Sequence, residues 1–408
     1  MAATPRPTRL RAPAPVAALA ALAALVSAQF ALAPAANAAL EGPAASACRD
    51  AAEVPVATGA VFNDPVAGTP TAVVAHLCSL IKQAPAGSSI ELAQFVISGD
   101  AGADFVEVLL DAHRRGVDVR VVMDGYQMDN PAAQAMLAGL GQDRSARSWV
   151  HVCSHLSPEG NTSSCQGTKG QHNKFYLFSE TGGRRDVVVQ ASNNLTDVNS
   201  RTYWNNAVVL PGNGRLFDAY GAYFADLAAE VQDPDYYRTV TTGMRGGRVT
   251  AHFFPSAEVD PIVERLDGIG CKRNGRTQVD VGMSEWDAER VAIAELLAGL
   301  AAEGCRVRVA HGPLADEVAA VLDASGVERR LLDGSTEAGR VHSKYTVVRD
   351  ATGRGSGRGF VLTGSHNFNA TSLYRNDEAL VDVALPEVVA SYAANFERLW
   401  EVGAAPRG

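Results

Sequence analysis

Two short motifs of the same kind lie far apart in the chain, and their side chains suit chemistry on a phosphate group. His172 is followed at the second position by Lys174, and His342 is followed in the same way by Lys344. A neutral imidazole can act as a nucleophile or as a proton carrier, and an ammonium group can hold an anionic oxygen. One such histidine alone would more often be a structural residue. Two copies of the pair make a site for anion chemistry the better interpretation.

A second pair of polar segments follows the two motifs at similar distances. The first copy contains Ser192 and Asn194, and the second contains Ser365 and Asn367. The segments open at Ala191 and Gly364, which lie 19 residues after His172 and 22 residues after His342. Small polar residues at the end of a strand can bind a ligand, although they also form turns. Their coupling to the two His-x-Lys motifs favours a part in the site.

The combined set fits nucleophilic catalysis on a phosphodiester. One neutral imidazole would attack phosphorus, and the other, in its protonated form, would give its proton to the leaving oxygen. The two lysines and the two asparagines would hold the non-bridging oxygens. The second imidazole would then deprotonate water or another alcohol, which would attack the phosphohistidine. No metal or other cofactor is needed in this scheme, because two ammonium groups supply the positive charge.

The elements that must position these motifs are also duplicated. Hydrophobic periodicity predicts a strand, a helix and a parallel strand in residues 89–122 and again in residues 278–310. The predicted helices end at Gly116 and Gly304, as is typical of helix C-termini. Each His-x-Lys motif is expected on a following strand, where alternation would place the histidine and the lysine on one face. This order of elements predicts an α/β fold.

A strand and a long helix close each repeat. The helices are expected over about residues 215–230 and 386–400. From the Ser-x-Asn segment onward, the two halves keep a constant offset of 173 residues. Residues 236–250, which contain several glycines, are expected to connect the halves. We therefore divide the chain into repeats at residues 39–240 and 241–408.

The N-terminus predicts a secretory signal peptide. Three arginines in residues 1–11 precede an apolar, alanine-rich run in residues 16–33, and a small-x-small cleavage pattern ends at Ala38. A membrane anchor is the alternative, because the run is near spanning length. Cleavage removes three arginines and no acidic residue, which changes the formal charge from −9 to −12. So acidic a mature chain argues against non-specific nucleic-acid binding, which depends on lysine and arginine.

All six cysteines follow the predicted signal peptide, and an even number in an exported chain favours three disulfides. Sequence alone leaves several pairings open. The simplest pairing joins neighbours along the chain, which gives Cys48–Cys78, Cys153–Cys165 and Cys271–Cys305. A zinc site is the alternative use of cysteine, but the sequence has no CxxC motif and no Cys/His cluster.

The doubled His-x-Lys and Ser-x-Asn motifs resemble those of the phospholipase D superfamily. The likeness extends over residues 89–400 and is strongest in the second half, at residues 364–367 and 376–378. The resemblance implies two pseudo-symmetric α/β/α sandwich lobes with the active site at the lobe interface. It also implies the phosphohistidine route described above.

The chain departs from the superfamily pattern at two kinds of supporting position. An aspartate usually stands five residues after the motif lysine, where this chain has Ser179 and Arg349. A glycine usually opens the Ser-x-Asn segment, where the first half has Ala191. Alanine is tolerated there if the backbone angle is not left-handed.

A third departure separates the roles of the two histidines. In the superfamily, an acid about fourteen residues after that glycine orients a histidine of the other half. Glu378 fills this position in the second half, but Asn205 fills it in the first. An anionic partner fixes the tautomer of an imidazole and supports its cation. The crossed pairing would give Glu378 to His172, so we expect His172 to be the nucleophile and His342 to be the general acid/base.

The motifs and the composition also lead to predictions about substrate, partners and location. Ser192, Ser365 and Asn205 are predicted to contact the substrate, and no metal ligand is predicted. The leading interpretation is a secreted phospholipase D that acts on phospholipid head groups at a membrane surface, by hydrolysis or by transfer to another alcohol. A metal-independent secreted nuclease of the same superfamily and a non-catalytic exported binding protein are the alternatives. No nucleic acid or stable protein partner is expected, and a monomer is expected to suffice because one chain supplies both half-sites.

Overall fold

The structure, a computed structural model, describes residues 47–272, 276–353 and 359–405. The predicted signal peptide at residues 1–38 lies outside this part of the chain. Within the described part, no helix combines the length and the apolar character that crossing a bilayer requires.

The first lobe consists of helices packed on one mixed β-sheet. Its elements are β1 (Gly59–Phe62), α1 (Ala72–Gln83), β2 (Ser89–Gln94), α2 (Gly99–Arg114), β3 (Asp118–Met123), α3 (Pro131–Leu140), β4 (Trp149–Val152), β5 (His155–Leu156), β6 (Ser163–Ser164), β7 (Lys174–Thr181), β8 (Arg184–Ala191), α4 (Asp197–Thr202), β9 (Tyr203–Trp204), β10 (Asn206–Leu210) and α5 (Gly214–Ala229). The strands of the large sheet lie in the order β1-β10-β8-β7-β2-β3-β4. β2 and β3 are parallel and α2 joins them, so the first predicted strand–helix–strand unit is confirmed.

The central strands of this sheet are apolar on both faces, as is expected of a sheet that helices cover on both sides. In β7, Phe175 and Leu177 belong to the core that includes α5, whereas Tyr176 and Phe178 belong to the core that includes α1 and α2. α1, α2 and α3 therefore cover the outer face of the sheet, and α5 covers the inner face.

The second lobe repeats this plan. Its elements are β11 (Arg238–Met244), β12 (Gly247–Phe254), α6 (Pro261–Asp267), β13 (Ile269–Gly270), β14 (Gln278–Met283), the 3-10 turn η2 (Ala288–Arg290), α7 (Val291–Ala302), β15 (Arg306–His311), α8 (Asp316–Ala324), β16 (Glu328–Leu331), β17 (Arg340–Val341), β18 (Lys344–Arg349), β19 (Thr352–Gly353), β20 (Gly359–Gly364), α9 (Ala370–Tyr374), β21 (Glu378–Ala384) and α10 (Pro386–Val402). The large sheet has the order β11-β12-β21-β20-β18-β14-β15-β16. β14 and β15 are parallel and α7 follows β14, so the second predicted unit is confirmed as well.

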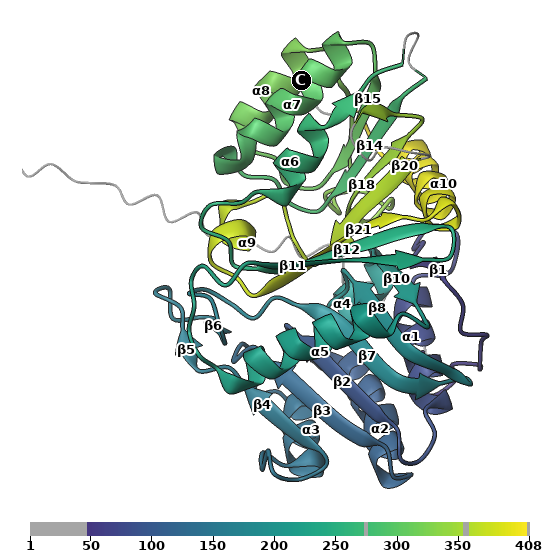
Figure 1. Cartoon of the computed structure of the whole chain (residues 1–408), viewed down its shortest axis with the longest axis vertical. Coiled ribbons are helices and arrows are strands. Elements are labelled where there is room, and N and C mark those ends of the chain that lie inside the picture. Colours follow the sequence, from purple (N-terminus) through teal and green to yellow (C-terminus); the bar gives the residue numbers. More distant parts are fainter. Residues whose placement is uncertain (1–46, 273–275, 354–358, 406–408) are drawn as a thin grey trace, which may run out of the picture. The chain divides into compact units, whose positions relative to one another are not determined.

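Aromatic side chains of the two inner helices hold the lobes together. Figure 1 shows the lobes stacked on each other, with β11 and β12 along their boundary. Tyr220 of α5 contacts Phe253 of β12 edge to face, with ring centroids 5.0 Å apart. Tyr392 of α10 contacts Phe62 of β1 in the same way at 4.9 Å. Such pairs add about 0.5–1.5 kcal/mol each to the burial of their surface. The pseudo-symmetric α/β/α sandwich lobes that the family resemblance implies are thus confirmed.

The expected connector at residues 236–250 is largely a β-hairpin. β11 and β12 pair antiparallel, and β12 joins the second sheet by pairing with β21. The cause is an alternating pattern in β12, where Val249, Ala251 and Phe253 are buried and the residues between them are half-buried. Gly246 has a positive φ of 95° and permits the tight turn. The glycines therefore mark a hairpin turn and not a linker.

Three disulfides link cysteines that are neighbours along the chain. The pairs are Cys48–Cys78, Cys153–Cys165 and Cys271–Cys305. This pairing confirms the simplest of the arrangements that the sequence left open. Disulfides in this number are typical of proteins in an oxidising compartment.

Candidate active site

Both histidine motifs lie at the boundary between the lobes, and each is fixed by the other half of the chain. The backbone N–H of His172 donates to the carbonyl of Asp377 at 2.9 Å, and that of His342 donates to the carbonyl of Trp204 at 2.9 Å. β17 pairs parallel with β9 beside His342, as Gln171 pairs with Asp377 beside His172. β7 and β18 begin only at the motif lysines, so the histidines lie just before the strands on which they were expected.

Glu378 holds the side chain of His172. Nδ1 of His172 donates to Oε1 of Glu378 at 2.8 Å. Glu378 is completely buried and also accepts hydrogen bonds from Ser365, Ser372 and Asn376. Burial alone would raise the pKa of Glu378, but the neighbouring imidazole and other positive groups bring that pKa to about 2. The carboxylate is therefore ionised and Nδ1 carries a proton, which leaves the lone pair of Nε2 for reaction.

His342 has an amide partner in place of a carboxylate. Its Nδ1 donates to Oδ1 of Asn205 at 3.0 Å. Nδ2 of Asn205 donates to the carbonyl of Asn199 at 2.9 Å, which fixes the amide with its oxygen toward the imidazole. Burial lowers the pKa of His342 well below its usual value, and the positive charges of the two motif lysines and of Arg340 lower it further. His342 is therefore neutral in the free protein at neutral pH.

The serines of the two Ser-x-Asn segments support these partners of the histidines. The hydroxyl of Ser192 donates to Oδ1 of Asn205 at 3.2 Å, and the hydroxyl of Ser365 donates to Glu378. Both serines and Asn205 are completely buried. The sequence predicted that these three residues contact the substrate. In the structure each serine also accepts a backbone N–H from the adjacent strand, so the serines hold the partners of the histidines, and their direct contact with substrate stays a prediction.

The two motif lysines lie beside the histidines. Nζ of Lys174 donates to the carbonyl of His172 at 2.7 Å, and Nζ of Lys344 donates to the carbonyl of His342 at 2.9 Å. Both lysines are buried. Burial lowers the pKa of both ammonium groups, that of Lys344 to about 7. A buried ammonium is stable only beside an anion, and a phosphate group would supply one for both lysines.

The two motif asparagines are held by their backbones and not by their side chains. The N–H of Asn194 donates to Oδ1 of Asn199 at 2.8 Å, and the N–H of Asn367 donates to the hydroxyl of Ser372 at 3.2 Å. In the described part of the chain, the side-chain oxygens of Asn194 and Asn367 have no hydrogen-bond partner. Both amides thus remain uncommitted within the protein and suit a part in binding.

The residues that replace the usual motif aspartates have structural contacts of their own. Ser179 lies near the far end of β7, where its hydroxyl accepts the N–H of Ser89 at 2.8 Å. Arg349 ends β18 and binds Asp280 at 2.8 Å. These positions hold neighbouring strands together, so the loss of the aspartate leaves the histidines and lysines in place.

The opening residue of each Ser-x-Asn segment reflects the distance to the next strand. Ala191 is not among the residues with a positive φ, so its side chain is tolerated. A Cβ at Gly364 would lie 2.2 Å from the carbonyl oxygen of Ala379, a distance that no side chain allows. Glycine is thus required in the second half by the close approach of β21 and not by the backbone angle.

Aromatic residues that the motifs do not reveal surround the two histidines. Phe95 lies edge to face with the His172 ring at 4.9 Å, and Tyr126 stacks on Phe95 at 5.5 Å. The Tyr203 ring lies 5.8 Å from the His342 ring. Phe95 lies within the strand predicted at residues 89–96 and directly follows β2 in the structure, so its place at the carboxyl end of a strand is the signal that could have found it.

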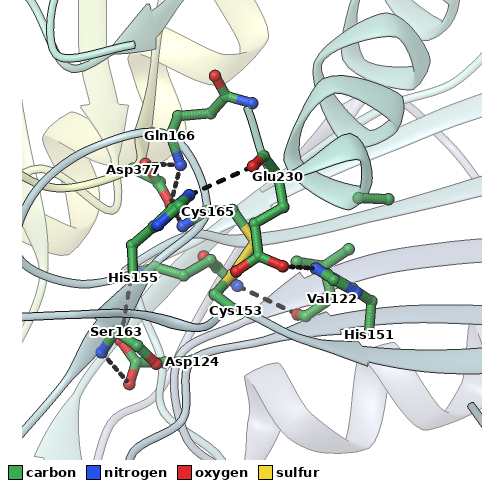
Figure 2. The surroundings of a disulfide bond; sticks show 12 residues. Val122, Asp124, His151, Cys153, His155, Ser163, Cys165, Gln166, Glu230 and Asp377 are labelled. Carbon is green, nitrogen blue, oxygen red and sulfur yellow. Dashed lines mark hydrogen bonds and ion pairs between the residues drawn. A yellow bond between two sulfur atoms is a disulfide. The ribbon is translucent and has the colours of Figure 1, made fainter. Parts of the chain in front are cut away.

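Asp377 holds the backbone of the segment that leads to His172. Its carboxylate accepts the N–H groups of three consecutive residues, Cys165 at 2.6 Å, Gln166 at 3.1 Å and Gly167 at 2.7 Å. Figure 2 shows this carboxylate beside Cys165 and Gln166. Burial raises the pKa of Asp377 to about 7, although the three N–H groups oppose the shift. No local pattern indicates this contact, because it joins residues about 210 positions apart.

Asp124 holds the two ends of the same segment. It accepts the N–H of Ser163 at 3.1 Å and that of Gln171 at 2.9 Å. The Cys153–Cys165 disulfide links the segment to the residue that follows β4. Burial raises the pKa of Asp124 to about 7. We call residues 163–171 the clamped segment, because two buried carboxylates and one disulfide fix it directly before His172.

The structure also bears on metal binding. In the part of the chain that is described, the cluster with a metal-like arrangement is Cys153, Cys165 and Asp377. The two cysteines form a disulfide, and Asp377 already accepts three N–H groups. A disulfide offers no thiolate, so this cluster does not fit a metal ion.

Comparison with known proteins places this arrangement among related folds. A family model described as "Cardiolipin synthase, PLD-like domain" matches residues 77–228 and 273–400, which contain both His-x-Lys motifs. No curated protein sequence is significantly similar to the chain.

Several solved structures resemble the chain. Phosphatidylserine synthase from Haemophilus influenzae Rd KW20 is 13% identical with a TM-score of 0.60, and the match covers 88% of this chain and 91% of that one. Polyphosphate kinase from Porphyromonas gingivalis is 16% identical with a TM-score of 0.55 over 84% of this chain, which spans only 50% of the kinase. Nuc, a phospholipase D family member from Salmonella typhimurium, is 18% identical with a TM-score of 0.30 and matches 42% of this chain over 100% of its own length. The first two similarities show a shared fold.

Proposed function

Because the chain belongs to the phospholipase D-like domain family, we propose that it is a phosphodiesterase that removes head groups from phospholipids through a phosphohistidine at His172. One observation carries the proposal. The crossed hydrogen bonds give His172 an ionised carboxylate and give His342 a neutral amide. An imidazole beside a carboxylate tolerates the positive charge that phosphorylation creates, and an imidazole beside an amide releases a proton more easily.

In the first proposed step, Nε2 of His172 attacks phosphorus and a nitrogen–phosphorus bond forms. The bond between phosphorus and the head-group oxygen breaks, and His342 gives its Nε2 proton to that oxygen. Lys174, Lys344 and the two motif asparagines hold the non-bridging oxygens as their charge changes. Glu378 stabilises the positive charge on His172.

In the second proposed step, His342 is neutral and takes a proton from water. The water oxygen attacks phosphorus, the nitrogen–phosphorus bond breaks, and His172 returns to its neutral state. The products are phosphatidic acid and the free alcohol of the head group. A second alcohol in place of water would give a transferred head group by the same path.

The acid role of His342 requires a proton that the free protein does not hold at neutral pH. Burial and the surrounding positive charges keep the pKa of His342 low. A bound phosphodiester brings a negative charge among these groups and raises that pKa. We therefore propose that substrate binding itself loads His342 with its proton.

Phospholipid is the proposed substrate class for reasons of charge and compartment. After removal of the predicted signal peptide the formal charge is −12, which disfavours the phosphate backbone of nucleic acid. The predicted export and the three disulfides fit a protein that meets lipid outside the cytoplasm. Both half-sites lie in one chain, so we propose that the secreted protein acts as a monomer.

A direct assay tests this function. Purified mature protein is incubated in a chelator with phosphatidylcholine vesicles and, separately, with plasmid DNA. The His172→Ala variant serves as the matched control. We expect choline release by the wild-type protein and none by the variant. Nicking of DNA without choline release would favour the nuclease alternative, and equal behaviour of the two proteins would overturn the proposed catalysis.

A further inference from the structure

We infer that the surroundings of His342 form a subsite for the leaving alcohol, in which Glu285 and Arg340 select an alcohol that carries both an ammonium and a carboxylate group, as serine does. This inference rests on the proposed function, because it takes His342 as the group that gives a proton to that alcohol. It goes further by naming the class of head group.

Arg340 and Tyr203 lie next to His342. Arg340 stands two residues before His342 in β17, and the pairing of β17 with β9 sets Arg340 opposite Tyr203. The guanidinium of Arg340 lies over the Tyr203 ring, 5.5 Å from its centroid. The same ring is tilted against the His342 ring at 5.8 Å. The three side chains therefore form one contiguous group.

Glu285 adds a carboxylate to this group. Nη2 of Arg340 lies 2.9 Å from Oε1 of Glu285, and the two side chains are 24% and 45% exposed, so a ligand can reach both. Burial lowers the pKa of Lys344, while Glu285 opposes that shift and Arg340 adds to it. The charged pair thus acts on the ammonium group that is proposed to hold the phosphate. It lies within electrostatic range of the reacting centre.

The equivalent positions beside His172 carry no such pair. Gln94 and Met283 both lie opposite the motif lysines, so the residue equivalent to Glu285 is Val96, which is buried. The residue two places before His172 is Gly170. The fold repeats, but the charged pair does not. A feature that breaks the symmetry on one side of a site is suited to a part of the substrate that lies on that side only.

The in-line arrangement of the attacking and leaving atoms places the leaving alcohol beside His342. In a displacement at phosphorus the attacking and leaving atoms lie roughly in line, so an alcohol expelled by His172 departs toward the proton donor. An alcohol with only a positive group would be repelled by Arg340, and one with only a negative group would be repelled by Glu285. A zwitterion offers its carboxylate to the guanidinium and its ammonium to the carboxylate. The Arg340 side chain as a whole is 24% exposed, and its fork of N–H donors can bind a carboxylate with two hydrogen bonds.

The closing experiment compares short-chain lipids that dissolve as monomers, so that vesicle charge has no influence. Dihexanoyl phosphatidylserine, phosphatidylethanolamine, phosphatidylcholine and phosphatidylglycerol are assayed with the wild-type protein, Arg340→Gln and Glu285→Gln. We expect the serine lipid to be cleaved about tenfold faster than the others at limiting concentration. Arg340→Gln should remove the advantage over the ethanolamine lipid, and Glu285→Gln should remove the advantage over the glycerol lipid, each by a change of about tenfold in the kcat/KM ratio.

The control pair is Arg120→Gln and Glu91→Gln. These residues form an ion pair of similar length, 2.8 Å, with side chains 33% and 17% exposed, on β3 and β2 of the first sheet. They should leave all four rates unchanged. Cleavage of all four lipids at equal rates, or an equal loss on every lipid in the Arg340 and Glu285 variants, would overturn the subsite and leave the proposed function standing.

A soluble diester, bis(4-nitrophenyl) phosphate, separates the two levels of the proposal. Free serine should inhibit its hydrolysis by the wild-type protein more strongly than ethanolamine or glycerol does, and Glu285→Gln should lose that difference. If neither this diester nor any lipid is cleaved, the proposed function itself fails and the subsite fails with it. Hydrolysis that all three alcohols inhibit equally would overturn the subsite alone.

Discussion

His172 and His342 occupy equivalent positions in two copies of one fold, yet their surroundings differ in charge. His172 binds the ionised Glu378 and lies against the ring of Phe95. His342 binds the amide of Asn205, and Arg340 lies close enough to lower its pKa. The repeat of the backbone sets where the two imidazoles lie, while single substitutions in each copy set their protonation. A duplicated site can therefore divide one reaction between two unlike groups.

The segments that lead to the two histidines are also held by different groups. The clamped segment before His172 is held by the buried carboxylates of Asp377 and Asp124. Before His342, Val341 donates to the carbonyl of Leu332 at 2.9 Å, the indole of Trp204 donates to that of Ala338 at 2.7 Å, and Arg340 pairs with Glu285. The half of the site that is proposed to form the covalent bond is thus held by completely buried carboxyl groups, whereas the carboxylate that pairs near His342 is 45% exposed.

The largest expected effect comes from removing each imidazole in turn. On bis(4-nitrophenyl) phosphate, His172→Ala should lose activity by about 10⁴-fold or more, because no covalent intermediate forms. His342→Ala should lose about 10²–10⁴-fold. The 4-nitrophenolate leaving group of this diester needs no proton, so His172 is still phosphorylated in the His342→Ala variant. The attacking water must lose a proton to a base, and the variant lacks that base, so phosphorylated protein should accumulate. Mass spectrometry of the trapped protein measures this, and a phosphate on His342 of the wild-type protein would reverse the proposed roles.

Exchanging the partners of the histidines sharpens the comparison. Glu378→Gln should lower kcat by about 10²–10³-fold, because an amide no longer supports the positive charge on His172. Asn205→Asp should change kcat by less than about tenfold but should move the alkaline limb of the pH profile of kcat/KM toward higher pH, because the first step needs a protonated His342 and an added carboxylate raises its pKa. Steady-state kinetics from pH 5 to 9 checks both variants. A large loss in Asn205→Asp with little loss in Glu378→Gln would contradict the assignment.

Opening one disulfide at a time tests the clamped segment. The Cys153→Ser/Cys165→Ser double variant should lower kcat about tenfold and the free energy of unfolding by about 3 kcal/mol, as expected for a bond that spans 12 residues. The matched control is Cys271→Ser/Cys305→Ser, which spans 34 residues in the other lobe. It should cost about 4 kcal/mol and leave the kcat of the folded protein unchanged. Equal kcat values in the two double variants would show that the first disulfide does not help to position His172.

The smallest expected effect is a pH dependence of anion binding. The pKa of Lys344 is about 7 in the free protein, mainly through burial, so above pH 7 this lysine is mostly neutral. A bound anion raises that pKa, so binding takes up a proton and affinity falls as the pH rises. Sulfate, which does not titrate in this range, should bind about fivefold more weakly at pH 8 than at pH 7. Calorimetry in two buffers of different ionisation enthalpy measures the proton uptake, and Lys344→Met should remove the part that Lys344 contributes and leave the proton that His342 takes up. An affinity that stays constant with pH would contradict the lowered pKa.

The sequence was sufficient for the fold and for the motifs that meet at its centre. The periodic apolar residues of the two strand–helix–strand units predicted their bounds to within a few residues, since each unit is fixed by local pattern. The crossed partners of the histidines followed from the family resemblance, and the hydrogen bonds are present. The catalytic roles given to these residues stay predictions until the kinetic tests above are made.

Contacts made only by tertiary pairing lay beyond the sequence. Asp377 reads as one acid of an Asn-Asp-Glu run, and nothing near it in the chain indicates that it holds residues 165–167. Ser192 and Ser365 are small polar residues after strands, a pattern that fits a ligand contact and a buried support equally well. Both cases depend on which strand lies alongside, and local pattern does not specify that neighbour.

The crossed hydrogen bonds carry a consequence for how such a protein can evolve. Neither repeat contains the partner of its own histidine, so a single repeat would complete its site only by pairing with a second copy around a two-fold axis. In that symmetric dimer every substitution would appear at both imidazoles at once. Fusion of the two copies into one polypeptide removes that constraint, and it allowed glutamate to stand at one of the two equivalent positions and asparagine at the other.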